Sequence, residues 1–155
     1  RVLVLQNEVS HAVNVAAAQV ARQNGAIVVL NAAPARAMAI DLLDNVDVLV
    51  VNRIEAEAMS GVHVIDRNSA VAALPHIGCP RSSIVITLGG KGLVVCPKAG
   101  APISIDAVPV QVTSTHGAGD CFVGVLAAQL AAEMPLEEAC RIANQQAAEF
   151  VSKLK

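Results

Sequence analysis

Residues 117–120, Gly-Ala-Gly-Asp, have the types and spacing best suited to chemistry in this sequence. An apolar β-branched run at 108–112 precedes them and an apolar periodic run at 122–130 follows, which predicts a strand, a tight turn and a helix. Gly117 and Gly119 permit backbone conformations and a close ligand approach that side chains forbid. The first amides of a helix have no acceptor inside it and lie at its positive end. The turn is therefore a candidate anion site.

A carboxylate at such a turn needs an explanation, because Asp120 repels a bound phosphate. The arrangement makes sense if Asp120 removes a proton from a hydroxyl group that attacks the phosphate. The amides of Gly117, Ala118 and Gly119 would then stabilise charge on the transferred group. The alternative is structural, with Asp120 favouring the helix N-terminus electrostatically. No Walker-type Gly-Lys-Ser/Thr motif is present, and Gly-x-Gly alone is not specific.

Composition limits the fold and the partners. Of the 155 residues, 54% are hydrophobic but only 1% are aromatic, so the core of a single domain must be aliphatic. Alternating Val/Ile-rich and Ala-rich runs indicate an α/β fold with a buried parallel sheet. The net charge of −2 without a basic cluster argues against a nucleic-acid partner. No apolar run reaches transmembrane length, which argues against a membrane partner.

The four cysteines form no Cys-x-x-Cys pair, so we expect reduced thiols in a cytoplasmic protein and no zinc site. Cys121 directly follows Asp120 and is a candidate nucleophile, but a packed thiol is the simpler interpretation. The chain begins with Arg1 and already reads as a strand from Val2. We therefore expect residues 1–155 to be a single α/β domain cut from a longer protein.

The expected elements alternate along the chain and place polar residues at strand ends. We expect strands at 2–5, 26–30, 46–51, 83–88, 93–96, 103–105 and 108–112. We expect helices at 11–23, 38–43, 53–59, 66–77, 118–133 and 135–155, with a kink or early end at Pro75. Glu8, Asn31 and Asn52 follow strands at the carboxyl edge, where open α/β sheets bind ligands.

Four stretches resemble, in the same order, the motifs of the ribokinase-like (PfkB-type) carbohydrate kinases: 31–36, 52–57, 87–92 and 115–124. The last resembles the family signature Asp-Thr-x-Gly-Ala-Gly-Asp-x-Phe-x-Gly. The first, Asn-Ala-Ala-Pro-Ala-Arg, looks most like the ribokinase members. The resemblance spans nearly the whole chain. It implies a Rossmann-like three-layer sandwich with a mostly parallel sheet, without the N-terminal part and lid that family members carry.

The resemblance implies ATP-dependent phosphoryl transfer to a sugar hydroxyl, most specifically from ATP to D-ribose to give ribose 5-phosphate. Asp120 would be the base and would contact the sugar. Glu8 matches a sugar-contacting glutamate, although it also fits a solvated loop acid. Adenosine or a fructose phosphate is an alternative acceptor, because kinases for these share the Gly-Ala-Gly-Asp motif.

The resemblance also implies residues for nucleotide and metal. Asn52 and Glu55 would hold Mg²⁺ through water, which suits a hard cation that retains waters; the alternative is a capping box at the helix start. Asn52 also belongs to the nucleotide set. The remaining nucleotide contacts implied are Thr87, Gly89, Gly92 and Asn144. Hairpin chemistry is the alternative explanation of the glycines.

Ser114 departs from the family pattern, which has an aspartate there that helps to hold a monovalent cation. A neutral hydroxyl removes one carboxylate ligand, so the resemblance leaves K⁺ activation in doubt. His116 occupies a variable position of the motif. We expect the full-length protein to be a homo-oligomer, most simply a dimer. A second hypothesis is a nucleotide-binding fragment without competent catalysis.

Overall fold

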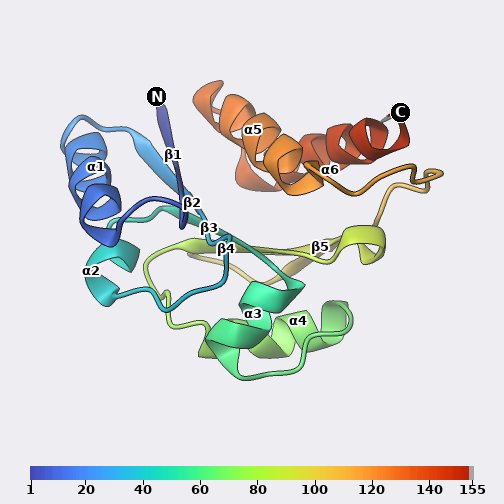
Figure 1. Ribbon diagram of the computed structural model, residues 1–155, viewed down its shortest axis with the longest axis horizontal. Coiled ribbons are helices and arrows are strands. Elements are labelled where there is room, and N and C mark those ends of the chain that lie inside the picture. The colour runs from blue at the N-terminus through green and yellow to red at the C-terminus, as the bar shows by residue number, and fades with distance from the viewer. Residues whose placement is uncertain (154–155) are drawn as a thin grey trace.

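The computed structural model describes residues 1–153 and contains a six-stranded sheet covered by helices on both faces (Figure 1). The strands lie in chain order: β1 (Val2–Gln6), β2 (Ile27–Asn31), β3 (Val48–Asn52), β4 (Ser83–Thr87), β5 (Leu93–Cys96) and β6 (Ile103–Ile105). The first four are parallel, whereas β5 and β6 pair antiparallel. The helices are α1 (His11–Gln23), α2 (Ile40–Leu43), α3 (Arg53–Ser60), α4 (Arg67–Ala73), α5 (Ala118–Ala131) and α6 (Leu136–Lys153), with short 3₁₀ turns η1 (Leu74–His76) and η2 (Gly89–Lys91).

The two faces of the sheet bury different side chains, because successive residues of a strand point to opposite sides. In β2, Val28 and Leu30 join the aliphatic core shared with α1 to α4. Val29 joins a second core formed with α5 and α6, which contains Phe122 and Leu126. Figure 1 shows α5 and α6 on one side of the sheet, with α3 and α4 on the other. The expected three-layer α/β sandwich with a mostly parallel sheet is confirmed.

Strand register brings polar residues together at one edge. Gln6 pairs with Asn31, and Asn52 pairs with Thr87, each as the last residue of its strand. The carboxyl ends of four neighbouring parallel strands therefore carry amide and hydroxyl groups in a row. This is the edge at which open α/β sheets bind ligands.

Two expected elements differ in the structure. The expected strand at 108–112 is wrong: residues 106–112 contain neither helix nor strand, and Pro109 has no amide hydrogen for a ladder. The expected helix at 66–77 is shorter. Asp66 is the N-cap of α4, which ends at Ala73, and η1 with Pro75 at its second position follows. The end of the helix expected to reach 155 lies partly outside the described residues.

Candidate functional site

The turn before α5 has the geometry of an anion site. Gly117 is the N-cap of α5 in the left-handed conformation, with φ of 75°, and no side chain caps the helix. The amide of Cys121 donates to Gly117 O over 2.9 Å, which starts the helical ladder. Within residues 1–153 the amides of Gly117 and Gly119 have no acceptor. These two N–H groups, and that of Asp120, which also has no acceptor within those residues, therefore stand at the positive end of a 14-residue helix.

Two expectations about this turn need correction. The Ala118 amide already donates to Thr115 O over 3.2 Å, so it is not free as expected. Gly119 lies within α5 with no positive φ, and a Cβ there would meet nothing within 4 Å. Its backbone conformation therefore does not require glycine, and only Gly117 does. Gly119 instead leaves open space above the helix end.

Asp120 lies exposed in the first turn of α5. Its Oδ1 accepts a hydrogen bond from Gln6 Nε2 at 3.2 Å. Gln6 is the last residue of β1, so this contact ties the carboxylate to the polar edge of the sheet. The carboxylate is thus held beside the free amides of the turn, and one oxygen keeps its lone pairs for a proton.

A cavity of about 460 Å³ lies beside this turn. Four parts of the sequence form its walls: the β4–β5 connection, the irregular segment after β6, the start of α5 and the inner face of α6. The lining includes Thr87, Gly89, Gly90, Gly92, Leu93, Ala107, Val108, Pro109, Val110, Val112, Thr115, Ala118, Gly119, Phe122, Asn144, Ala147, Ala148 and Val151. The expected nucleotide residues Thr87, Gly89, Gly92 and Asn144 thus share one cavity with Ala118 and Gly119. A mostly apolar wall with an amide-rich end suits a flat base attached to phosphates.

The walls of this cavity are fixed by specific contacts. Asn144 Nδ2 donates to Asp106 O over 2.9 Å, so α6 holds the start of the irregular segment in place. A Cβ on Gly92 would lie 2.1 Å from Ile105 O, and Gly92 has a φ of 85°. Gly92 therefore lets the segment after β6 pass directly against the β4–β5 turn. Thr87 Oγ1 donates to Val51 O over 3.4 Å.

Asn52 and Glu55 form a complete capping box at the start of α3. Asn52 Oδ1 accepts from the amides of Ile54 and Glu55, while Glu55 Oε2 accepts from the Asn52 amide over 2.7 Å. Glu55 Oε1 accepts from Asn52 Nδ2 over 2.7 Å. Burial raises the pKa of the Glu55 carboxyl above its usual value, although the two Asn52 donors oppose that shift. The alternative weighed for this pair, a capping box, is confirmed.

The capping box limits how this pair could hold magnesium. Both carboxylate oxygens of Glu55 and the side-chain oxygen of Asn52 already accept hydrogen bonds, and Glu55 is only 4% exposed. Within residues 1–153 no cluster of three or more His, Cys, Asp or Glu residues could enclose a metal ion. The hydrogen bonds of the capping box and the burial of Glu55 therefore disfavour direct ligation of a metal ion by this pair.

The remaining sequence candidates lie around this edge. Glu8 is exposed two residues after β1 and makes no hydrogen bond or ion pair within the described residues. Ser114 Oγ accepts from the His116 amide at 3.3 Å, so it offers a cation one neutral oxygen. Arg36 Nη2 donates to Val9 O at 2.6 Å, which ties this arginine to the loop before α1.

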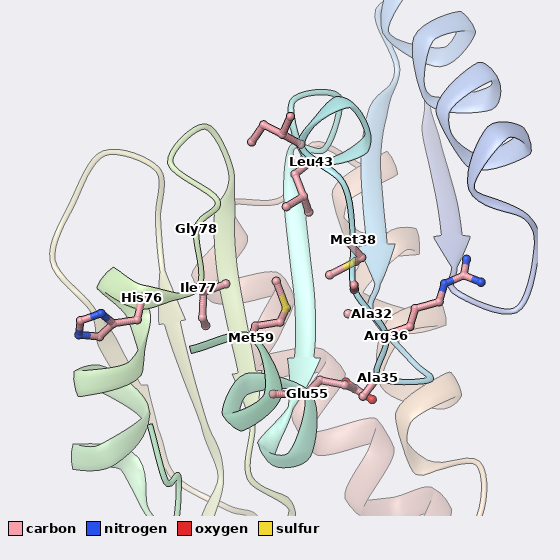
Figure 2. A pocket seen from close by; sticks show the side chains of 13 residues that line it. Ala32, Ala35, Arg36, Met38, Leu43, Glu55, Met59, His76, Ile77 and Gly78 are labelled. Atoms are coloured by element: carbon pink, nitrogen blue, oxygen red, sulfur yellow. The ribbon is translucent and has the colours of Figure 1, made fainter. Parts of the chain in front are cut away.

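A second cavity, of about 550 Å³, lies on the opposite helical layer (Figure 2). Met38, Met59 and Ile77 come from the loop after β2, from α3 and from the segment after η1, with Arg36 and His76 at opposite ends of the set. Glu55 borders it, but the Gly117 turn and Asp120 do not. This cavity therefore lies apart from the Gly117 turn, and of the candidate site residues it is lined by Glu55.

The thiols take no part in this arrangement. All four cysteines are free, as expected. Burial raises the pKa of the Cys121 thiol, which disfavours the thiolate needed of a nucleophile. The interpretation of Cys121 as a packed thiol fits this direction. No helix within residues 1–153 combines the length and apolar character needed to cross a lipid bilayer.

Three contributing residues carried no recognisable pattern in the sequence. Gln6 ends an apolar strand, and only the fold brings it to Asp120. Asn7 is 2% exposed and its Nδ2 donates to the carbonyls of Ala32 and Pro34, which anchors the loop after β2. Phe150 near the end of α6 packs against the Gly117 turn. Of these three residues, only Asn7 had a positional signal in the sequence, because it directly follows an apolar strand at the edge where ligands bind.

Comparison with known proteins shows the family to which this chain belongs. The family model described as pfkB family carbohydrate kinase matches residues 2–155. A ribokinase of Haemophilus influenzae is 41% identical over 138 residues, covering 88% of this chain and 45% of that protein. The mouse ribokinase is 36% identical over 151 residues, covering 93% of this chain and 46% of that protein. The chain thus spans about half the length of these relatives.

Among solved structures, Arabidopsis thaliana ribokinase complexed with ribose and ATP superimposes with a TM-score of 0.89. Its sequence is 25% identical, and the match covers 97% of this chain and 49% of that one. Phosphofructokinase-2 of Escherichia coli matches with a TM-score of 0.79 at 20% identity, which shows the shared fold alone.

Proposed function

Because this chain belongs to the pfkB family of carbohydrate kinases, we propose that it is the nucleotide-binding and catalytic half of a sugar kinase. The kinase transfers the γ-phosphoryl group of ATP to a hydroxyl group of a sugar. The proposed sugar is D-ribose, and the product is ribose 5-phosphate. The observation that carries the proposal is the position of Asp120 beside the free amides of Gly117 and Gly119. The base would then act on the attacking hydroxyl group, while the anion site would hold the phosphoryl group that is transferred.

In this proposal, Asp120 accepts the proton of the attacking sugar hydroxyl. Gln6 orients the carboxylate by donating to Oδ1, which leaves Oδ2 for the sugar. The amides of Gly117 and Gly119 stabilise negative charge on the transferred phosphoryl group at the helix N-terminus. Glu8 lies at the same strand edge and would contact the sugar.

The cavity of about 460 Å³ is the proposed nucleotide site. The adenine would lie between the 107–112 segment and α6, where Asn144 fixes the wall. Thr87, Gly89 and Gly92 would border the ribose and phosphates. Mg²⁺ would neutralise phosphate charge when bound, and Asn52 and Glu55 would hold it through water. Ser114 offers one neutral oxygen to a K⁺ ion, so we propose weak or no potassium activation.

The H. influenzae and mouse relatives named as ribokinases support ribose as the acceptor. A kinase for another acceptor, such as adenosine or a fructose phosphate, is the second candidate. The placement of Glu8 favours this candidate. Glu8 is exposed and has no partner among the described residues that fixes its side chain, so its position does not select ribose over another phosphoryl acceptor. A third candidate is a nucleotide-binding fragment without catalysis, since the chain spans only about half of its relatives.

The test is ADP formation from ATP and Mg²⁺ with D-ribose, adenosine or fructose 6-phosphate, run on this chain and on the complete gene product. The proposal predicts turnover with ribose by the complete protein. Turnover with another sugar acceptor alone would replace ribose as the substrate. No turnover with any acceptor, while ATP still raises the melting temperature, would leave only nucleotide binding.

A further inference from the structure

The last turn of α6 lies directly beneath the segment that enters the Gly117 turn. Val151 O accepts from the amides of Thr113 at 3.0 Å and Ser114 at 3.4 Å, and Ser152 O accepts from Thr113 Oγ1 at 3.3 Å. The last four carbonyls of a helix have no partner inside it. Here the chain leading into the anion turn supplies donors for two of them, Val151 O and Ser152 O. Main-chain hydrogen bonds thus join the end of α6 to the segment before the turn. Because backbone atoms make these bonds, they do not depend on the side chains of Val151 or Ser114.

The ring of Phe150 completes this support. A Cβ on Gly117 would lie 3.3 Å from Cε1 and 3.5 Å from Cζ of Phe150, so the ring edge occupies the space beside the left-handed residue. Phe150 is 37% exposed and belongs to neither aliphatic core. It also does not line the nucleotide cavity, although its neighbours Ala148 and Val151 do. The contact of Phe150 that bears on the site is therefore the one between its ring and Gly117.

We propose that the end of α6, through the Phe150 ring and the Val151 and Ser152 carbonyls, is a positioning element for the anion turn. This inference rests on the proposed function, because it concerns the same two free amides. The ring blocks one direction of movement for Gly117, and the carbonyls fix the two residues that lead into it. Phe150 itself touches no substrate in this arrangement. It acts through Gly117 and is a positioning residue.

The kinetic test compares Phe150→Ala with Leu136→Ala in the complete gene product. Leu136 begins the same helix and packs against the core formed with α5 and α6, whereas the atoms near a Cβ on Gly117 belong to Phe150. A displaced amide weakens stabilisation of the transition state more than nucleotide binding, since small misplacements reduce rate strongly. We expect Phe150→Ala to lower kcat roughly tenfold and to change KM for ATP less than about twofold. Phe150→Leu should recover part of kcat.

An unchanged kcat in Phe150→Ala, or an equal kcat loss in Leu136→Ala, would overturn the inference. A matched loss in both variants would assign Phe150 a general packing role. A rise in KM for ATP without a change in kcat would place Phe150 in nucleotide binding instead.

Amide hydrogen exchange on this chain tests the same inference without any activity. The Thr113 amide is bonded to Val151 O and the Ala118 amide to Thr115 O, so both report on the turn. We expect Phe150→Ala to accelerate exchange at these two amides more than about tenfold, whereas Leu136→Ala accelerates neither selectively. If the wild type lacks turnover, the proposed function fails, and exchange alone decides this inference. Unchanged exchange in Phe150→Ala would refute it whatever the activity.

Discussion

Gln6 Nε2 and Asp120 Oδ1 are 3.2 Å apart, although 114 positions separate the two residues in sequence. The hydrogen bond joins the last residue of β1 to the first turn of α5. It therefore links the polar edge of the sheet to the anion turn on which the proposed transfer depends. The two side chains meet here because β1 lies at the edge of the sheet and contacts α5.

Replacement of Gln6 by Ala should release the Asp120 carboxylate without removing it. We expect kcat for the sugar-dependent reaction to fall roughly three- to tenfold, because a base in the wrong orientation transfers protons less often. ATP binding should be nearly unchanged, since Gln6 does not line the nucleotide cavity. Steady-state kinetics and ATP titration measure both quantities. Gln19→Ala, on the exposed face of α1, is the control and should leave both unchanged.

Replacement of Asn52 by Ala removes the side-chain half of the α3 capping box. The free energy of unfolding should fall by about 1 kcal/mol, as for other lost N-caps. Urea denaturation measures this loss. Asp66→Ala is the matched variant, because Asp66 caps α4 in the same manner with Ser69. Both variants should be less stable, but only Asn52→Ala should weaken the dependence of activity on Mg²⁺. Equal effects on Mg²⁺ dependence would argue that Asn52 acts through stability alone.

Replacement of Gly92 by Ala should destabilise the protein strongly. The new Cβ would lie 2.1 Å from Ile105 O and 2.8 Å from Ala107 N, at a φ of 85° that L-residues rarely adopt. We expect a loss of more than about 3 kcal/mol in the free energy of unfolding, or no folded protein. Gly90→Ala, with nothing within 4 Å of its Cβ and no positive φ, is the control. Thermal unfolding of the two variants separates them, and a stable Gly92→Ala protein would contradict the packing described.

Cys121 and Cys140 should react more slowly with a thiol reagent in the native protein than in the unfolded protein. Burial, with Glu137 nearby, raises the pKa of Cys140 to about 12, and burial also raises the pKa of Cys121. A raised pKa leaves less thiolate at any pH below it, so native Cys140 should not react with a thiol reagent at pH 8. Unfolded protein should react at all four cysteines. Rapid labelling of native Cys140, read by peptide mass spectrometry, would contradict the buried placement.

The sequence predicted elements with strong periodicity and motifs with local geometry. The buried strands at Val28 and Leu49 and the turn at Gly117 were predictable, because runs of apolar β-branched residues and glycine act through neighbouring residues. The strand at 108–112 was predicted wrongly, because β-branched residues favour a strand, whereas Pro109 has no amide hydrogen for a ladder. The support from Gln6 and Phe150 arises from tertiary packing, which no local pattern records.

The measurement that tests the central claim most directly is sugar-dependent ADP formation by the Asp120→Asn variant of the complete gene product. Asparagine keeps the size of the side chain and can accept from Gln6, but it cannot remove a proton. The account predicts a fall in kcat of at least about a hundredfold, with ATP affinity close to that of the wild type. Turnover within a few-fold of the wild type would contradict the role of Asp120 as the base.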